Sequence, residues 1–342
     1  MTKKRSLVLA LALVTACLIT GTLQAAPPGE KEDLIIYAYD SFVAEWGPAP
    51  VVIPKFEKKY DVTVKVVSVG DAGQVLNRVI LEKEKPRADI ILGIDNNMLS
   101  RALEEEVLRP YTSPYLTDIP EKLLFDDTLA VTPFDYGYFA FVYDSAIIKD
   151  PPESLEDLTD PRFKKKIILQ DPRTSSPGLG FLLWTIAVYG DTFTEYWKRL
   201  MPNLLTITDG WDTAYGMFTA GEAPMVLSYT TSPPYHLEYE GTERYLALVF
   251  HEGNYIQIEG MGIVKGAPHE DMARKFIDFI LTEDFQKEIA LTNWMYPVNP
   301  RVSLPASFRL APEPEIFLQI PAEEIQDNLD TWIEAWVRVV SR

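Results

Sequence analysis

Short apolar runs alternate with amphipathic segments along most of this chain, and this pattern constrains its fold more than any other feature. Buried strands are predicted at residues 34–40, 62–69 and 88–93. Each is followed by a segment of helical periodicity, at residues 52–59, 74–83 and 97–106. Strands that alternate with helices form a parallel sheet covered by helices. The first part of the chain therefore predicts one α/β lobe.

A strongly β-prone run, YGYFAFVY at residues 136–143, lies where this pattern restarts, and it predicts a strand that crosses into a second lobe. Residues 255–264 have the same character and would cross back. We predict lobe 1 from residues 33–135 plus 256–342, and lobe 2 from residues 136–255. Two α/β lobes joined by two crossovers enclose a cleft, and open α/β sheets bind ligands where the carboxyl ends of strands face it.

The N-terminus is typical of a secretory signal. Positive residues at positions 3–5 precede an apolar stretch, and small residues stand at Ala25 and Ala26, which predicts a signal peptide over residues 1–25. No later segment reaches about 18 apolar residues. The only cysteine, Cys17, ends a stretch, VTAC, that is similar to a lipobox. Cleavage there would leave a lipid anchor, and both processing routes place the protein in the periplasm or on the extracytoplasmic face of the membrane.

Charge and cysteine content exclude several classes of protein. Cleavage near Ala25 leaves no thiol, which excludes disulfides, cysteine–metal sites and a cysteine nucleophile. It also removes three positive charges, so that the net charge goes from −18 to −21. Nucleic acid is not expected as a partner, because binding it needs a basic surface. A cationic ligand would be attracted, although acidity can also serve solubility alone.

Six segments at predicted strand ends share an aromatic and polar composition. One of them is SYTTSPPYH at residues 228–236, which we interpret as a loop. The others are residues 39–48, 70–73, 171–178, 208–211 and 293–297. The aromatic and polar side chains that they contribute are Tyr39, Trp46, Asp71, Ser175, Trp211, Tyr229, Tyr235 and Trp294.

This inventory describes the ligand as an aromatic cation with a hydroxyl or phosphate tail. An aromatic face attracts a desolvated cation by about 0.5–2 kcal/mol. A carboxylate adds charge pairing, and hydroxyls and helix N-termini can hold a phosphate. Two simpler interpretations stay open, namely that Trp46 is a hydrophobic cover and that Asp71 is a helix N-cap.

Motifs for catalysis are not found. The three histidines, His236, His251 and His269, lack metal-ligand spacing, and the chain has neither a nucleophile elbow nor a phosphate-binding glycine loop. We predict no catalytic residue, no metal, no cofactor and no enzymatic activity.

The chain resembles the periplasmic thiamine-binding proteins of bacterial ABC transporters, which have the type II, two-lobed flytrap fold. The similar stretches include YAYDSFVAEWGPAPVV, ADIILGIDNN, PFDYGYFAFVYD, QDPRTSSPGLG, LSYTTSPPYH and NWMYPV. The resemblance implies a monomer that closes over thiamine or its mono- or diphosphate and delivers it to a permease driven by an ATPase. It implies ligand contacts at Tyr39, Trp46, Asp71, Ala72, Ser175, Trp211, Tyr229, Tyr235 and Trp294. Ala72 departs from the family, which has glycine there.

Roles for these residues follow as hypotheses. Tyr39, Tyr229 and Tyr235 pack around the two rings of the ligand, and the three tryptophans wall the cleft. Asp71 pairs with a charged or amino end, and Ser175 holds the hydroxyl or phosphate tail. The alternatives are a type II receptor for ferric iron or a polyamine, and an enzyme resembling thiaminase I, whose cysteine nucleophile the mature chain lacks.

Overall fold

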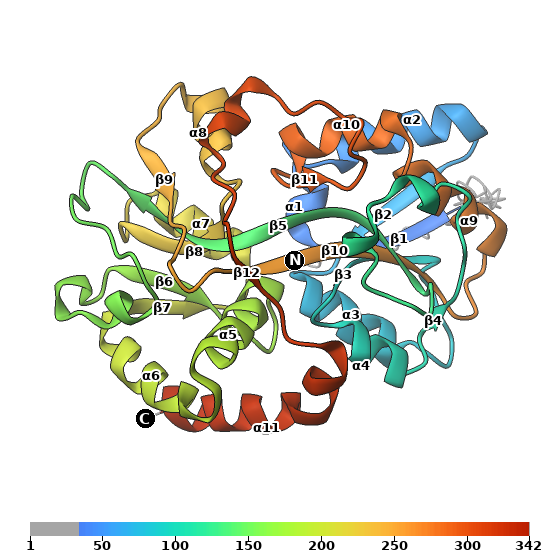
Figure 1. The fold of residues 1–342 in the computed structure, drawn as a ribbon. Helices are drawn as coiled ribbons and strands as arrows, with labels where there is room; N and C mark the ends of the chain where they lie inside the picture. Colours follow the sequence, from blue (N-terminus) through green and yellow to red (C-terminus); the bar gives the residue numbers. More distant parts are fainter. Residues whose placement is uncertain (1–33, 342) are drawn as a thin grey trace, which may run out of the picture. The chain divides into compact units, whose positions relative to one another are not determined.

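The computed structural model describes residues 34–341, whose main strands form one mixed sheet in the order β2-β1-β3-β10-β5-β8-β6-β7 (Figure 1). These strands are β1 (Leu34–Ala38), β2 (Val64–Ser68), β3 (Ile90–Asp95), β5 (Val131–Asp144), β6 (Ile167–Gln170), β7 (Leu204–Thr208), β8 (Met225–Tyr229) and β10 (Asn254–Val264). Four short strands pair at the side: β4 (Leu108–Arg109), β9 (Tyr245–Ala247), β11 (Tyr296–Pro297) and β12 (Phe317–Leu318).

At each end of the sheet, neighbouring strands pair in parallel. β1 pairs in parallel with β2 and β3, and β6 pairs in parallel with β7 and β8. All residues of β3 and β6 are buried, as expected for strands covered by helices on both faces. The predicted two-lobed α/β architecture is confirmed, and we name the lobes by these strands: the first lobe surrounds β1, β2 and β3, and the second surrounds β6, β7 and β8.

Two long antiparallel strands, β5 and β10, connect the lobes. β10 pairs with β3 and with the first part of β5, whereas residues 139–143 of β5 pair with β8. Both predicted crossover strands are therefore present. β5 begins at Val131, earlier than predicted. The prediction began too late because Pro133 interrupts the strand pattern in the sequence. In the structure Pro133 lies at an irregularity, where the pairing with β10 skips Phe134.

Helices cover both ends of the sheet. Those of the first lobe are α1 (Asp40–Val43), α2 (Ala49–Tyr60), α3 (Ala72–Leu81), α4 (Leu99–Glu104), α9 (Glu270–Ile280) and α10 (Glu283–Thr292). Those of the second are α5 (Ser176–Tyr189), α6 (Phe193–Leu200), α7 (Trp211–Thr219) and α8 (Pro233–Glu240). Short 3-10 helices are η1 (Leu116–Asp118), η2 (Glu121–Leu123), η3 (Glu156–Thr159), η4 (Pro161–Phe163), η5 (Gly190–Thr192), η6 (Met201–Asn203) and η7 (Ala306–Leu310).

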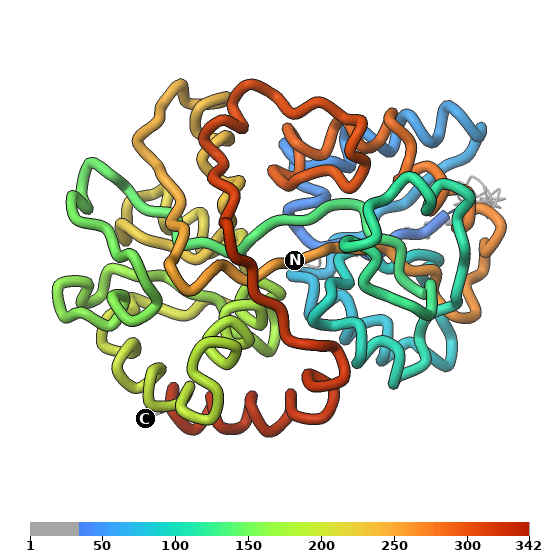
Figure 2. The backbone as a smooth tube through the Cα atoms, in the orientation of Figure 1, coloured from blue at the N-terminus to red at the C-terminus, as the bar shows by residue number. Residues whose placement is uncertain are grey.

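The last part of the chain contacts both lobes. After residue 300 it passes beside α8, pairs through β12 with β10, and continues into α11 (Ala322–Val340), as Figure 2 shows. α11 packs against both α4 and α6. The ring of Trp336 lies 5.8 Å from that of Trp197, and both are buried. The sequence predicts α11 as part of lobe 1, whereas it contacts helices of both lobes. The predicted boundaries between the lobes, at residues 135/136 and 255/256, stay a prediction.

Other predictions concern the N-terminus. The signal peptide and Cys17 lie outside the described residues. Within residues 34–341, no helix combines the length and the apolar character needed to cross a bilayer.

Candidate functional site

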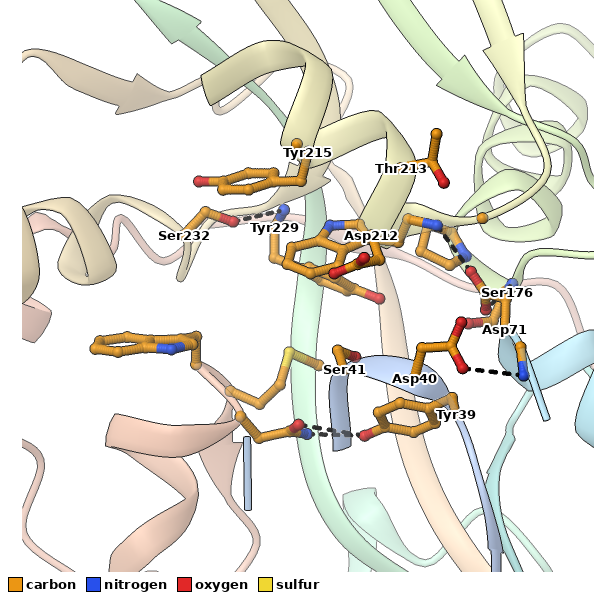
Figure 3. Close-up of a pocket in the computed structure, with 18 of the residues that line it drawn as sticks. Tyr39, Asp40, Ser41, Asp71, Ser176, Asp212, Thr213, Tyr215, Tyr229 and Ser232 are labelled. Carbon is orange, nitrogen blue, oxygen red and sulfur yellow. Dashed lines mark hydrogen bonds between the residues drawn. The ribbon is translucent and has the colours of Figure 1, made fainter. Parts of the chain in front are cut away.

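A pocket of about 300 Å³ lies where segments of both lobes meet (Figure 3). Its walls come from the segment after β1, the N-termini of α3, α5 and α7, the end of β8 with the start of α8, the middle of β10, and residues 293–295. This volume falls at the small end of the range for small-molecule sites, which is roughly 300–1,000 Å³. The pocket is therefore large enough for a compact ligand.

Most of the predicted site residues line this pocket. Those that do are Tyr39, Trp46, Asp71, Trp211, Tyr229, Tyr235 and Trp294. Ala72 and Ser175 do not: each is 2% exposed and lies behind the lining. The neighbours Ser176 and Pro177, in the first turn of α5, line the pocket where Ser175 was expected.

Aromatic rings of the two lobes contact one another across the pocket. The ring of Trp46 lies 6.3 Å from that of Trp211 and 6.5 Å from that of Tyr235. Tyr235 in turn packs edge-on against Trp294 at 5.4 Å, and Trp211 stacks on Tyr215 at 4.8 Å. Trp46 follows the first strand of the first lobe, so its contacts with Trp211 and Tyr235 connect the two lobes.

The stretch SYTTSPPYH is not the loop that we predicted. β8 ends at Tyr229, and α8 begins at Pro233. Prolines are tolerated in the first helical turn because the backbone N–H that they lack has no partner there. The start of α8 directs Tyr235 toward the pocket wall, and the indole Nε1 of Trp211 donates to Ser228 Oγ at 2.9 Å.

Trp294 owes its position to the end of α10. Its backbone is left-handed, with φ of +55°, and its N–H donates to the carbonyl of Ile289 at 3.1 Å. Such a residue ends a helix and turns the chain sharply. The turn places Asn293 and Trp294 in the pocket lining, and Trp294 Nε1 is buried without a partner among residues 34–341.

Asp71 connects three helix N-termini. Its carboxylate accepts the N–H of Ala72, at the start of α3, at 2.6 Å. It also accepts the N–H of Trp211, at the start of α7, at 2.9 Å, and that of Ser176 in α5 at 3.4 Å. Helix N-termini attract anions because their N–H groups are unpaired and the helix dipole is positive there. The N-termini of α5 and α7 in the second lobe form a position that attracts an anion, and the carboxylate of Asp71, a residue of the first lobe, occupies this position.

Glu259 lines the floor of the pocket, and a second carboxyl group, that of the fully buried Asp135, lies next to it outside the lining. The hydroxyl of Tyr39 donates to Glu259 Oε2 at 2.9 Å, and Asn293 Nδ2 donates to Asp135 Oδ2 at 2.5 Å. Burial raises the pKa of Glu259 to about 8, with a further contribution from the charge of Asp95. Burial and the charge of Glu259 likewise raise the pKa of Asp135 well above its usual value.

A second network ties Tyr229 to the same floor. Its hydroxyl donates to Gln257 Oε1 at 2.6 Å, and Gln257 Nε2 donates to Asp95 Oδ2 at 2.7 Å. Burial raises the pKa of Tyr229 well above 10, so the phenol remains a donor at neutral pH. This network fixes the ring of Tyr229 against the crossover strand β10.

Seven pocket residues lie outside the six segments identified in the sequence, namely Gln74, Asp212, Thr213, Tyr215, Gly216, Thr219 and Glu259. Glu259 was passed over as part of a strand, although a lone carboxylate within IQIEGMGIV is an unusual feature that could have identified it. Tyr215 was assigned to a helix without a role, and Asn293 was noted only as a turn residue. No local signal distinguishes these two, because the tertiary packing alone brings them to the pocket.

Comparisons with known proteins give a consistent result. Residues 85–328 match the family described as bacterial extracellular solute-binding protein. The chain is 45% identical to the thiamine-binding periplasmic protein of Brucella abortus biovar 1 (strain 9-941), over 97% of this chain and 99% of that protein. It is 41% identical to the thiamine-binding periplasmic protein of Escherichia coli (strain K12), over 96% of this chain and all of that protein. The solved structure of a periplasmic thiamin binding protein superposes with a TM-score of 0.86 at 41% identity, covering 90% of this chain and 96% of that one.

Proposed function

This chain belongs to the family of bacterial extracellular solute-binding proteins, and from that premise we propose that it captures thiamine and its phosphate esters outside the cytoplasmic membrane for an ABC importer. The relatives at 41–45% identity are named for thiamine binding, and they align over nearly the whole chain. In this function the protein binds and releases its ligand without a chemical step. It is a binding protein and not an enzyme.

The observation that carries this proposal is a pocket between the lobes with aromatic walls and a buried carboxyl group, that of Glu259, in its lining. Thiamine is flat and carries a permanent positive charge on its thiazolium ring. Each well-placed aromatic face contributes about 0.5–2 kcal/mol to the binding of a desolvated cation. Glu259, only 5% exposed, adds a carboxyl group to the same space.

The aromatic residues divide into two groups by position. Tyr39, Tyr229 and Tyr235 pack around the two rings of the ligand, and their hydroxyls or edges are already oriented by neighbouring groups. Trp46, Trp211 and Trp294 wall the pocket. The contacts of Trp46 with the second lobe exist only when the lobes are closed, so these indoles cover the ligand after it has entered.

The polar end of the ligand lies beside the N-termini of α5 and α7. We predicted that Asp71 pairs with a charged or amino end, and that Ser175 holds the tail. Because the carboxylate of Asp71 already accepts backbone N–H groups, we propose instead that it supports closure, and that Ser176 replaces Ser175 near a hydroxyl or phosphate tail. The contribution of Ala72 is its N–H, which Asp71 accepts.

Capture and delivery use the two crossover strands. Bending of β5 and β10 opens the cleft, and ligand contacts with both lobes favour the closed form. The closed protein, a monomer, then docks on a permease driven by a cytoplasmic ATPase. Residues 1–25 direct export, and either plain cleavage or a lipid on Cys17 keeps the protein at the extracytoplasmic side.

The other ligands that we considered make different demands. Among residues 34–341, no group of three or more His, Cys, Asp or Glu side chains is arranged to hold a metal ion. A ferric complex held by tyrosinates would be coloured, so addition of iron to the protein tests that option directly. A polyamine is flexible and gains little from flat walls, and competition by spermidine would reveal it. Base exchange of thiamine with a free amine would reveal a thiaminase activity.

Titration of tryptophan fluorescence with thiamine, its monophosphate and its diphosphate tests the proposal. We expect saturable quenching by all three at micromolar protein or below. Trp46→Phe and Trp211→Phe should lose much of the signal, whereas Trp332→Phe serves as the matched control because Trp332 lies outside this pocket. Absence of any spectral change and of any calorimetric heat with thiamine would contradict the proposed function.

A further inference from the structure

Three acidic residues lie side by side across three neighbouring strands, and one of them, Glu259, lines the pocket. In the pairing register, Glu259 of β10 is opposite Asp95 of β3 on one side and Asp135 of β5 on the other. Side chains of directly opposed residues lie on the same face of a sheet and close together. Since β10 and β5 are the crossover strands, this row of acids lies at the junction of the two lobes.

Asp95 is well supplied with hydrogen-bond donors. Its carboxylate accepts the backbone N–H groups of Asn97 and Met98, both at 2.9 Å, and the amides of Gln257 and Asn97 at 2.7 and 3.3 Å. Burial raises the pKa of Asp95 to about 6, and these donors oppose that rise because they stabilise the ionised form. Asp95 therefore has a structural explanation that requires no ligand.

Glu259 and Asp135 have fewer hydrogen-bond donors than Asp95. Tyr39 donates to Glu259, and Asn293 donates to Asp135, but Asp135 Oδ1 is buried without a partner among residues 34–341. Two ionised carboxyls in contact and out of water would repel each other strongly. One proton between them would remove the repulsion and provide the missing donor, in agreement with the raised pKa values of both groups.

The surroundings contain no positive charge to replace that proton. The titratable groups that act on the pair come from four sides: the segment after β1, the N-terminus of α3, the end of β3 and the end of β8. They are Tyr39, Asp71, Asp95 and Tyr229, all of them acidic groups or phenols. Within the described residues, no lysine, arginine or histidine is among the groups that shift either pKa. A cation can come only from the ligand.

We propose that Glu259 and Asp135 share one proton in the empty pocket, and that the cationic ring of the bound ligand, seated over Glu259, displaces this proton into solvent. This inference depends on the proposed function, because it takes thiamine as the ligand. The charge balances: the ligand brings one positive charge, and one proton leaves. Glu259 then selects the charged ring over a neutral ring of the same shape, which the aromatic walls alone would accept.

A pH dependence follows from this exchange. In the empty protein the pair holds its shared proton below about pH 8, the value to which burial raises the pKa of Glu259, whereas the complex requires the ionised carboxylate. Affinity for the cation must therefore rise with pH, by up to about tenfold per pH unit below this pKa, and level off above it. Because the two carboxyls are coupled, the pKa that is measured belongs to the pair.

Calorimetry in two buffers of different ionisation enthalpy tests the inference at pH 7. The probes are thiamine and an isosteric analogue whose five-membered ring is neutral. We expect thiamine binding to release a substantial fraction of one proton, and binding of the analogue to release almost none. Glu259→Gln should abolish the release and reduce the preference for thiamine over the analogue at least tenfold.

Glu84→Gln is the matched control, because Glu84 is an exposed acid outside the pocket lining and is not in the row of strand acids. It removes one negative charge but should leave the proton release intact. Thiamine binding without proton release, together with an unchanged preference in Glu259→Gln, would overturn the inference while the proposed function stands. Because the proton count uses the unmodified protein, the test does not depend on the folding of a variant. If thiamine gives no heat at all, both proposals fail.

Discussion

Replacing Asp71 tests how the lobes are held closed. Asp71→Asn keeps a side-chain oxygen that can cap α3 but removes the charge that faces α5 and α7. Asp71→Ala removes both. Asparagine and aspartate are similar N-caps, whereas alanine costs about 1 kcal/mol of stability. The asparagine variant therefore separates the effect on closure from the effect on folding.

The magnitude follows from the contacts between lobes. The bond from the N–H of Trp211 is short, at 2.9 Å, and that from Ser176 is long, at 3.4 Å, so we count only the first at full strength. A hydrogen bond to a charged group contributes roughly 1.5–3 kcal/mol net. Since this bond exists only in the closed form, its loss should weaken thiamine binding by about 10–150-fold.

Phosphate esters should respond differently. The asparagine no longer presents a negative charge to the helix N-termini, which then become available to the phosphate. The ratio of monophosphate to thiamine affinity should therefore increase in Asp71→Asn by at least about tenfold, corresponding to roughly 1.4 kcal/mol. Isothermal calorimetry with both ligands measures the ratio, and X-ray scattering reports closure. An asparagine variant with wild-type affinities and wild-type compaction would refute the reasoning.

Three further variants probe the walls and the packing. Tyr229→Ala should weaken thiamine binding more than tenfold because it removes an aromatic wall, and an unchanged dissociation constant would exclude Tyr229 from the site. Gly93→Ala should also weaken binding, since φ is +96° at Gly93 and an added Cβ would lie 2.6 Å from the ring of Tyr39. Titration of the folded variant with thiamine checks this. Trp336→Ala should lower the free energy of unfolding by about 3–5 kcal/mol, measured by urea denaturation, and leave the affinity for thiamine unchanged in the folded protein.

Much of the pocket could be predicted from the sequence because its residues follow strand ends. Tyr39, Asp71 and Trp211 all stand at the carboxyl end of a strand or at the first residues of the following helix, where α/β proteins place their ligands. Ser175 occupies such a position too, but the first turn of α5 exposes Ser176 to the pocket instead. A helix turns by about 100° per residue, so an error of one position moves a side chain to another face.

The apolar periodicity and the aromatic strand ends determined, without any structure, that this chain forms two α/β lobes with a cleft for a flat cation. These features are local, and each can be identified within about ten residues. Only the tertiary structure decided that Glu259 and Asp135 are opposed on the crossover strands, and that Asp71 reaches the helices of the other lobe. Those relations depend on strand register and lobe closure, which join residues more than a hundred positions apart, and no local pattern encodes them.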